Sequence, residues 1–438
     1  MPSKPAHGGS TPAAGSPSPN DRDRPARHPP SGEPASYRAL FRTPEFTPLF
    51  LTGAAQIAAH TVAGLGLAIL VYRATGSPLL SSLALFTPSL AQLIGATTLL
   101  SAADRVPPRA VISGVALFFA LGTTVLAMPA LPTWAVFAVL LVLGLASSLG
   151  GGVRHGLLNE ILPRERYLLG RSVVNMSAGV CQIGGFAAGG VLLAVLSPRG
   201  TVLVGAGLYL TAALVARFGL GARPPRATGR ASVAATWRTN ARLWAVPARR
   251  RCYLALWVPN GLIAGAESLF VPYDPEHAGL LYAFGALGML TGDTLVGRFL
   301  PPRLRARLRY PLQALLAAPF LAFALDPGLA LAAVLVTLAT IGYGASLLHQ
   351  ERLMTLVPEE LSGHALGLHG SGMAALQGVS AALAGTVAQF TSPRTGMAAL
   401  AVVSLLVTLA LVRGDRADRA DKTGRTGRTA LTAEPSTA

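Results

Sequence analysis

The chain has 438 residues, of which 51% are hydrophobic and only 13% are charged, and its formal net charge is +17. A soluble protein usually carries about 25% charged residues, so the composition excludes an ordinary soluble domain. The basic residues are spread over loops between apolar blocks, with no basic stripe and no interleaved aromatic residues. This distribution argues against a nucleic-acid-binding protein.

Twelve apolar segments follow one another along the chain, with lengths near the roughly 20 residues that a helix needs to cross a bilayer. The sequence therefore predicts an all-α integral membrane protein with twelve transmembrane helices. Short turns rich in Pro and Gly separate many of the segments. The predicted helices lie at 46–71, 79–101, 110–129, 132–153, 168–196, 200–221, 252–272, 277–299, 308–325, 328–348, 364–390 and 394–413.

The longest internal connection divides the segments into two groups of six. It carries nine arginines and no acid between Arg217 and Arg251. Its Trp237 and Trp244 are compatible with a helix lying on an anionic membrane surface, and a solvated linker is the alternative. We expect five regions: a disordered cytoplasmic tail (1–42), an N-terminal six-helix bundle (43–221), a cytoplasmic basic linker (222–250), a C-terminal six-helix bundle (251–413) and a second disordered cytoplasmic tail (414–438).

Basic residues are distributed unequally between the two sides of the membrane that twelve crossings would define. Of the 36 Lys and Arg residues, only Arg73, Arg199 and Arg394 fall on one side, and the other 33 fall in the tails and alternate loops. Because basic loops are retained in the cytoplasm, the sequence predicts a multi-pass protein of the inner (cytoplasmic) membrane with both termini in the cytoplasm.

The two groups of six segments share features at a nearly constant offset. Gln182 and Gln377 are 195 residues apart, and so are Gly190 and Gly385. Val-Pro-Pro-Arg at 106–109 is matched 194 residues later by Leu-Pro-Pro-Arg. Repeated features at one offset indicate duplication. Since six crossings bring the chain back to its starting side, both halves insert in the same orientation as a parallel, pseudo-symmetric repeat.

With these features, residues 40–413 resemble the major facilitator superfamily. The family signature between its second and third helices is Gly-x-x-x-Asp-Arg followed by basic residues. Asp104, Arg105 and Arg109 match it, whereas Leu100 replaces the usual Gly. The resemblance implies the major facilitator fold and a cytoplasmic gate at this loop, and the candidate gate residues are Asp104, Arg105, Arg109, Arg154 and Arg298. The alternative is that Asp104 only neutralises its neighbours and fixes topology.

Glycines on the fifth segment resemble a second signature, which is typical of exporters in this superfamily. The exporter pattern is Gly-Pro-x-x-Gly-Gly. Gly185, Gly189 and Gly190 match it, and Phe186 replaces the Pro. Small residues spaced along a helix allow a neighbouring helix to approach closely. The pattern favours an exporter, and close packing without that meaning is the alternative.

Ionisable side chains within the apolar segments are candidates for proton coupling, because each one costs at least about 2.5 kcal/mol in the bilayer. Glu267 on segment seven lies about 22 Å from the inner end of its helix. A carboxylate at the outer water boundary is the alternative for this residue. His60 and Asp293 are further candidates; a packing role for His60 and an ion pair of Asp293 with Arg298 are their alternatives.

Neutral polar residues and one further histidine recur within the segments. They are compatible with substrate binding in a central cavity, and hydrogen bonds between helices are the alternative. The cavity candidates are Gln56, Asn175, Gln182, Asn260, Gln377 and His369.

The sequence thus favours a secondary active transporter that exports small amphipathic compounds, such as drugs or secondary metabolites, in exchange for protons by alternating access. A proton-coupled uptake symporter is the main alternative, followed by a non-transporting sensor or a membrane enzyme. We expect no enzymatic activity, cofactor or metal. The expected partners are a small-molecule substrate, protons and the lipid bilayer, with no nucleic acid, and the expected state is a monomer.

Overall fold

The computed structural model describes residues 37–98, 106–162, 164–224, 233–358 and 361–431. Within these ranges every regular element is a helix. Among the described residues, eleven helices are long and apolar enough to cross a membrane, and α3 contributes a shorter apolar stretch, Pro78–Ala91. The prediction of an all-α membrane protein is confirmed.

The N-terminal half contains six crossings that lie near the predicted segments. They are α2 (Phe46–Thr75), α3 (Pro78–Thr98), α5 (Pro108–Leu126), α6 (Thr133–Ile161), α7 (Arg164–Val195) and α8 (Pro198–Gly219); the short α1 (Tyr37–Phe41) precedes them.

The C-terminal half also contains six crossings, several of which are interrupted. They are α10 (Pro247–Glu267) with α11 (Phe270–Tyr273), α12 (Ala278–Thr294) with the π-helical turn η2 (Leu295–Phe299), α13 (Pro302–Ala317) with the 3-10 helix η3 (Ala318–Leu325), α14 (Leu329–Ile341) with η4 (Gly342–Gly344) and α15 (Ala345–Leu356), α16 (Ser362–Phe390), and α17 (Pro393–Leu431).

Proline and glycine set many of the helix ends. Proline is the first residue of α3, α5, α8, α10, α13 and α17, where its fixed φ suits the helix and its missing N–H is not needed. At the end of α2, Gly76 takes φ 63° and its N–H donates to the carbonyl of Tyr72 at 2.8 Å. This left-handed conformation favours glycine and permits the tight turn into α3.

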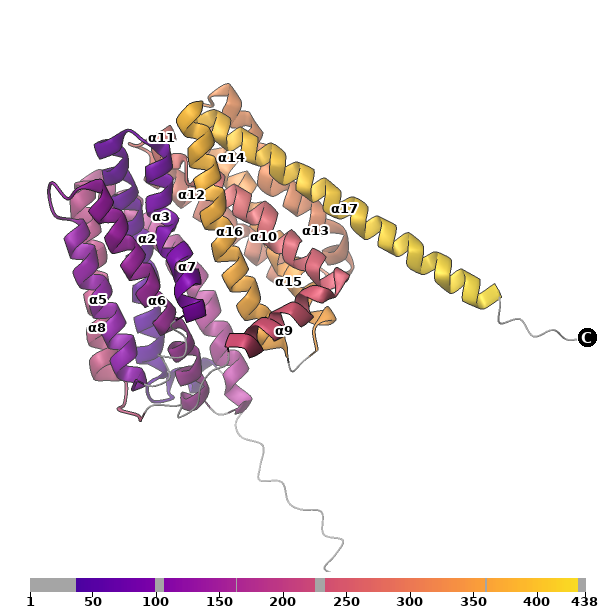
Figure 1. The fold of residues 1–438 in the computed structure, drawn as a ribbon, viewed down its shortest axis with the longest axis horizontal. Coiled ribbons are helices and arrows are strands. Elements are labelled where there is room, and N and C mark those ends of the chain that lie inside the picture. Colours follow the sequence, from indigo (N-terminus) through magenta and orange to yellow (C-terminus); the bar gives the residue numbers. More distant parts are fainter. Residues whose placement is uncertain (1–36, 99–105, 163, 225–232, 359–360, 432–438) are drawn as a thin grey trace, which may run out of the picture.

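The two halves stand side by side (Figure 1) and contact each other mainly through α3 with α16 and through α7 with α12. We call the end of the bundle that carries Arg217, Arg223, Arg303 and Arg305 the arginine-rich end. The opposite end carries the turns after α2, α7, η3 and α16.

The halves are held together at the opposite end. The hydroxyl of Ser77 donates to Oε1 of Gln389 at 2.7 Å, and the hydroxyl of Tyr72 donates to the carbonyl of Pro272 at 3.4 Å. A Cβ added to Gly385 would lie 2.7 Å from Cα of Leu79, so α16 and α3 are in close backbone contact. These contacts close the space between the halves at this end.

The connection between the halves contains a helix, α9 (Val233–Ala245), inside the region expected as a linker. Leu243 is fully buried, and Trp244 stacks on Trp257 of α10 with ring centroids 5.5 Å apart. His364 of α16 makes a 2.7 Å hydrogen bond with Asn240. The helix is therefore packed against the C-terminal half, while Trp237 remains 61% exposed.

The last helix differs from the sequence prediction. A disordered tail was expected from residue 414, but α17 continues to Leu431 (Figure 1). Asp415 explains part of the difference: it is only 4% exposed, pairs with Arg352 and accepts a 2.8 Å hydrogen bond from the Tyr310 hydroxyl. The segment expected as a tail therefore includes an acid that binds the helix to its own half.

Candidate functional site

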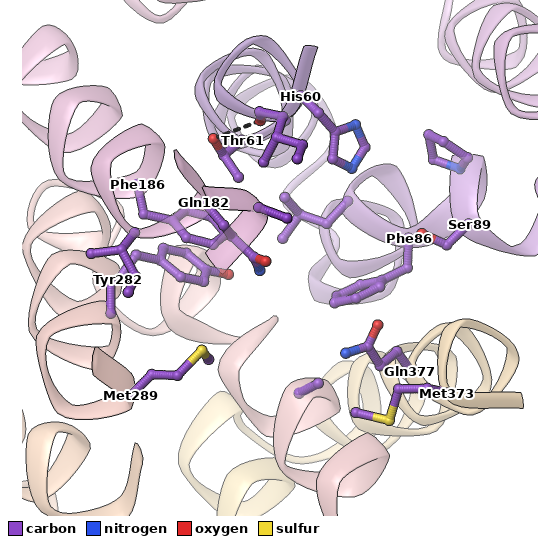
Figure 2. A pocket seen from close by; sticks show the side chains of 18 of the residues that line it. His60, Thr61, Phe86, Ser89, Gln182, Phe186, Tyr282, Met289, Met373 and Gln377 are labelled. Atoms are coloured by element: carbon purple, nitrogen blue, oxygen red, sulfur yellow. Dashed lines mark hydrogen bonds between the residues drawn. The ribbon is translucent and has the colours of Figure 1, made fainter. Parts of the chain in front are cut away.

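A cavity of about 790 Å³ lies between the two halves. Figure 2 shows side chains from both halves around it, including His60 of α2, Gln182 of α7, Tyr282 of α12 and Gln377 of α16. Aromatic and thioether groups form much of the wall, with hydroxyl and amide groups between them. Such a lining can bury an apolar body and orient a few polar groups by hydrogen bonds.

Glu267 lies on the cavity wall at the end of α10, where the helix breaks before α11. Its Oε1 accepts a hydrogen bond from the Tyr343 hydroxyl at 3.2 Å. Its backbone carbonyl accepts another from the Tyr282 hydroxyl at 2.9 Å. Glu267 thus lines the cavity, with its carboxyl group bound by Tyr343 and its backbone carbonyl bound by Tyr282.

Charged and titratable groups of opposite kinds line opposite walls. His60 and Arg154 belong to the N-terminal half, whereas Glu267 and Asp293 belong to the C-terminal half. Asp293 follows Tyr282 by 11 residues on α12, which places it about 16 Å nearer the arginine-rich end. The cavity wall therefore extends from the level of Glu267 toward that end, with the two acids at different depths.

Three of the six cavity candidates, Gln56, Gln182 and Gln377, lie on the cavity wall, and so do the three proton-coupling candidates His60, Glu267 and Asp293. The side chain of Asn175 lies outside the described residues, and so do Asp104 and Arg105 of the expected gate.

Asn260 and His369 differ from the prediction, because neither is among the described residues that line the cavity. Asn260 is 3% exposed and donates hydrogen bonds to the Leu256 carbonyl and to the Ser346 hydroxyl. His369 accepts a hydrogen bond from the indole N–H of Trp257 within the same half. Both residues connect helices of the C-terminal half, which was the alternative reading of these polar groups.

The described members of the expected gate lie at the arginine-rich end. Arg109 donates to the Leu220 carbonyl at 3.5 Å, and Arg298 is exposed in η2. The guanidinium of Arg154 lies against Gly53 of α2, where an added Cβ would come within 2.7 Å of it. Near the same end of α6, Glu160 forms an ion pair with Arg223, Nε to Oε2 at 3.7 Å.

The glycines of α7 serve two different interfaces. Gly185 and Gly189 face α2, where a Cβ on Gly185 would overlap the Thr61 hydroxyl and one on Gly189 would touch Val62. Gly190 instead faces Gly279 of α12, and its Cβ would lie 2.8 Å from the carbonyl carbon of that residue. The first two glycines pack the N-terminal half internally, and the third permits contact between the halves.

Two tyrosines of the site escaped the sequence analysis. Tyr282 and Tyr343 both line the cavity and both donate hydrogen bonds to Glu267. A hydroxyl-bearing ring inside an apolar segment was the available signal, because a buried tyrosine needs a hydrogen-bond partner.

Comparison with known proteins assigns the family. The model of the Major Facilitator Superfamily matches residues 49–350, so the chain belongs to this superfamily. No curated protein matches the chain in sequence.

Solved transporters share the fold at low sequence identity. A POT family transporter in complex with a thioalcohol-conjugated peptide superposes with a TM-score of 0.66 at 11% identity, covering 85% of this chain and 96% of that one. The nucleoside transporter NupG gives 0.63 at 15% identity, with 84% and 98% covered. A bacterial homologue of the lysosomal transporter Spinster, in an inward-facing and unoccupied conformation, gives 0.61 at 14%, with 84% and 95% covered. The protein is therefore a multi-pass membrane transporter of the major facilitator fold and not an enzyme.

Proposed function

We propose that this protein exports small amphipathic compounds in exchange for protons, and that Glu267 carries the proton. The observation that carries the proposal is a carboxyl group on the wall of a cavity between the two halves, where it accepts a hydrogen bond from the Tyr343 hydroxyl. An acid at this place can bind a proton or a substrate cation in turn, which is what exchange requires.

The proposal includes the direction of transport, which is export. The glycines of α7 resemble those of exporters, and the aromatic wall formed by Phe86, Phe186 and Tyr282 suits an amphipathic body. Uptake with protons is the competing function. It shares the cavity and Glu267, so it differs only in the direction in which substrate and protons move.

We further infer that the arginine-rich end is cytoplasmic, because basic loops are retained on that side. The cavity then opens toward the cytoplasm and is closed on the outer side by the contacts of α3 with α16 and of α7 with α12. The cavity would become accessible from each side of the membrane in turn by rocking of the two halves. Since one chain supplies both halves, we propose that the monomer is the working unit.

The test uses inverted membrane vesicles in which respiration makes the interior acidic. A panel of fluorescent amphipathic dyes identifies a transported compound by comparison with vesicles that lack the protein. An exporter accumulates the dye inside inverted vesicles and releases it when the pH gradient is collapsed. A proton symporter instead takes up the compound in right-side-out vesicles.

The matched variants are Glu267→Gln and Glu276→Gln. Glu276 carries the same side chain but is exposed in the loop before α12. Glu267→Gln should abolish gradient-driven accumulation, whereas Glu276→Gln should leave it unchanged. Accumulation that persists in Glu267→Gln would remove this residue from the mechanism.

A further inference from the structure

An aromatic stack crosses from one half of the protein to the other at the inner surface of the closed end. Phe186 of α7 and Tyr282 of α12 have ring centroids 4.8 Å apart and planes inclined by 10°. Both rings line the cavity and lie next to each other in Figure 2. Because each half supplies one ring, the stack exists only while the halves are together at this depth.

The stack continues into a backbone contact that closes the cavity. Gly190 follows Phe186 by four residues, and Gly279 precedes Tyr282 by three, so each pair shares one face of its helix. The backbones of the two glycines touch, and a Cβ on Gly190 would lie 2.8 Å from the carbonyl oxygen of Gly279. The rings and the glycines therefore form one interface between α7 and α12.

Tyr282 joins this interface to the acid. Its hydroxyl donates to the backbone carbonyl of Glu267 at 2.9 Å, at the end of α10 where carbonyl groups lose their helical donors. Tyr343 holds the carboxyl group of the same residue at 3.2 Å. The ring of Phe270, just beyond the helix break, packs edge-on against Tyr282 at 5.1 Å. The end of α10 and the Tyr282 ring are therefore in direct contact.

We propose that Tyr282 is a positioning residue that connects the protonation state of Glu267 to the contact between the halves, with Phe186 as the surface on which it is held. The proposal rests on the proposed function of Glu267. Loss or gain of the proton changes the hydrogen bond with Tyr343 and moves the end of α10. Tyr282 moves with that end, its ring leaves Phe186, and the glycine contact opens.

Other titratable groups also line the cavity and can contribute to a pH response. Tyr343 of η4 and Tyr282 of α12 contact Glu267 directly. The remaining ones on the described wall are His60 of α2, Arg154 of α6, Tyr209 of α8 and Asp293 of α12.

The experiment measures the separation of the halves at the closed end. Spin labels replace Arg199 at the start of α8 and Glu276 before α12, both of which are exposed. The native cysteines Cys181 and Cys252 are changed to Ser in all variants. Distance distributions are recorded at pH 5.5 and pH 8.5 by pulsed electron paramagnetic resonance.

Phe186→Ala removes the stack and Phe119→Ala is its matched control. Phe119 also lines the cavity, but it packs on Tyr209 of its own half with centroids 5.0 Å apart. An aromatic pair contributes enough that its loss should raise the population with separated halves about fivefold. We expect this increase in Phe186→Ala at both pH values and not in Phe119→Ala. Phe186→Trp should restore the distribution of the native protein.

Tyr282→Phe removes the hydrogen bond to Glu267 but keeps the stacked ring, so it tests the two contacts separately. It keeps the ring, so the closed state should persist, but the response of the distances to pH should be lost. Equal behaviour of Phe186→Ala and Phe119→Ala would overturn the proposal, and so would a native pH response in Tyr282→Phe.

A Glu267→Gln variant distinguishes failure of this proposal from failure of the proposed function. If Glu267→Gln keeps the native pH response, or if the native protein has none, Glu267 is not the coupling acid. If Glu267→Gln loses the response while the aromatic variants behave like their control, only the role of Tyr282 and Phe186 fails.

Discussion

Gly190 and Gly279 touch backbone to backbone where α7 and α12 cross, although they belong to different halves of the protein. Any side chain at either position would occupy space that the other backbone already fills. The closed end of the cavity therefore depends on the smallest residue at two places 89 residues apart in the chain.

Gly190→Ala should destabilise the state described here. The added Cβ would lie 2.8 Å from backbone atoms of Gly279, which cannot move aside without moving α12. We expect about tenfold less of the state closed at this end, measured with the labels at 199 and 276. Gly184→Ala is the matched control, since its Cβ would meet nothing within 4 Å. Equal distributions in the two variants would contradict this role of Gly190.

Asp415→Asn should destabilise the C-terminal half. Asp415 is 4% exposed and pairs with Arg352, with Arg251 at 3.7 Å and with Arg309 at 4.0 Å. Removing the acid leaves the buried Arg309 guanidinium without this counter-charge, at a cost of about 3 kcal/mol. Thermal unfolding in detergent should show a clear loss of stability.

A second ion pair serves as the control for that experiment. Asp326 and Arg394 are paired at 2.8 Å, but both are about half exposed at the opposite end. Asp326→Asn should change the unfolding free energy by less than about 1 kcal/mol. If Asp415→Asn and Asp326→Asn lower the free energy of unfolding equally, burial of the Asp415 ion pairs does not stabilise α17.

Glu45→Gln should make the protein less stable at neutral pH but not in acid. Glu45 accepts hydrogen bonds from the Gly221 N–H at 3.0 Å and from Arg223 Nη2 at 3.1 Å. Burial opposes ionisation of Glu45, but these bonds outweigh it and hold the pKa of this carboxyl below its usual 4.5. The stabilisation is therefore present above pH 4.5 and is lost as the pH falls through the lower, folded-state pKa.

The measurement is the unfolding midpoint of the native protein and of Glu45→Gln between pH 3 and pH 7. The difference should correspond to about 1 kcal/mol at pH 7 and shrink toward pH 3. A difference that grows in acid would have the wrong sign and would exclude this ion pair as its cause.

The crossings were predictable because each one follows from a local property. An apolar run of sufficient length forms a helix in the bilayer, and Pro or Gly marks where it ends. The polar residues Gln56, Gln182 and Gln377 line the cavity, and their substrate role remains a prediction that rests on the rule that a polar group in such a helix seldom faces lipid.

The parts that were missed depend on residues far apart in the sequence. Asn260 was expected in the cavity, but it reaches Ser346 of α15, a partner that no local pattern reveals. Tyr282 and Tyr343 were not recognised because an aromatic residue in an apolar run is equally compatible with lipid contact. Asp415, just beyond the predicted end of α17 at residue 413, contacts Arg352 and Tyr310, which come from two other helices.

The central claim is that protonation of Glu267 shifts the cavity from one end of the protein to the other. It is tested most directly by two pairs of spin labels on one protein. One pair replaces Arg199 and Glu276 at the opposite end, and the other replaces the exposed Ala110 of α5 and Thr355 of α15 at the arginine-rich end. Between pH 5.5 and pH 8.5, one distance should lengthen as the other shortens, and Glu267→Gln should keep both distances constant. Two distances that change together, or an unaltered response in Glu267→Gln, would contradict the account.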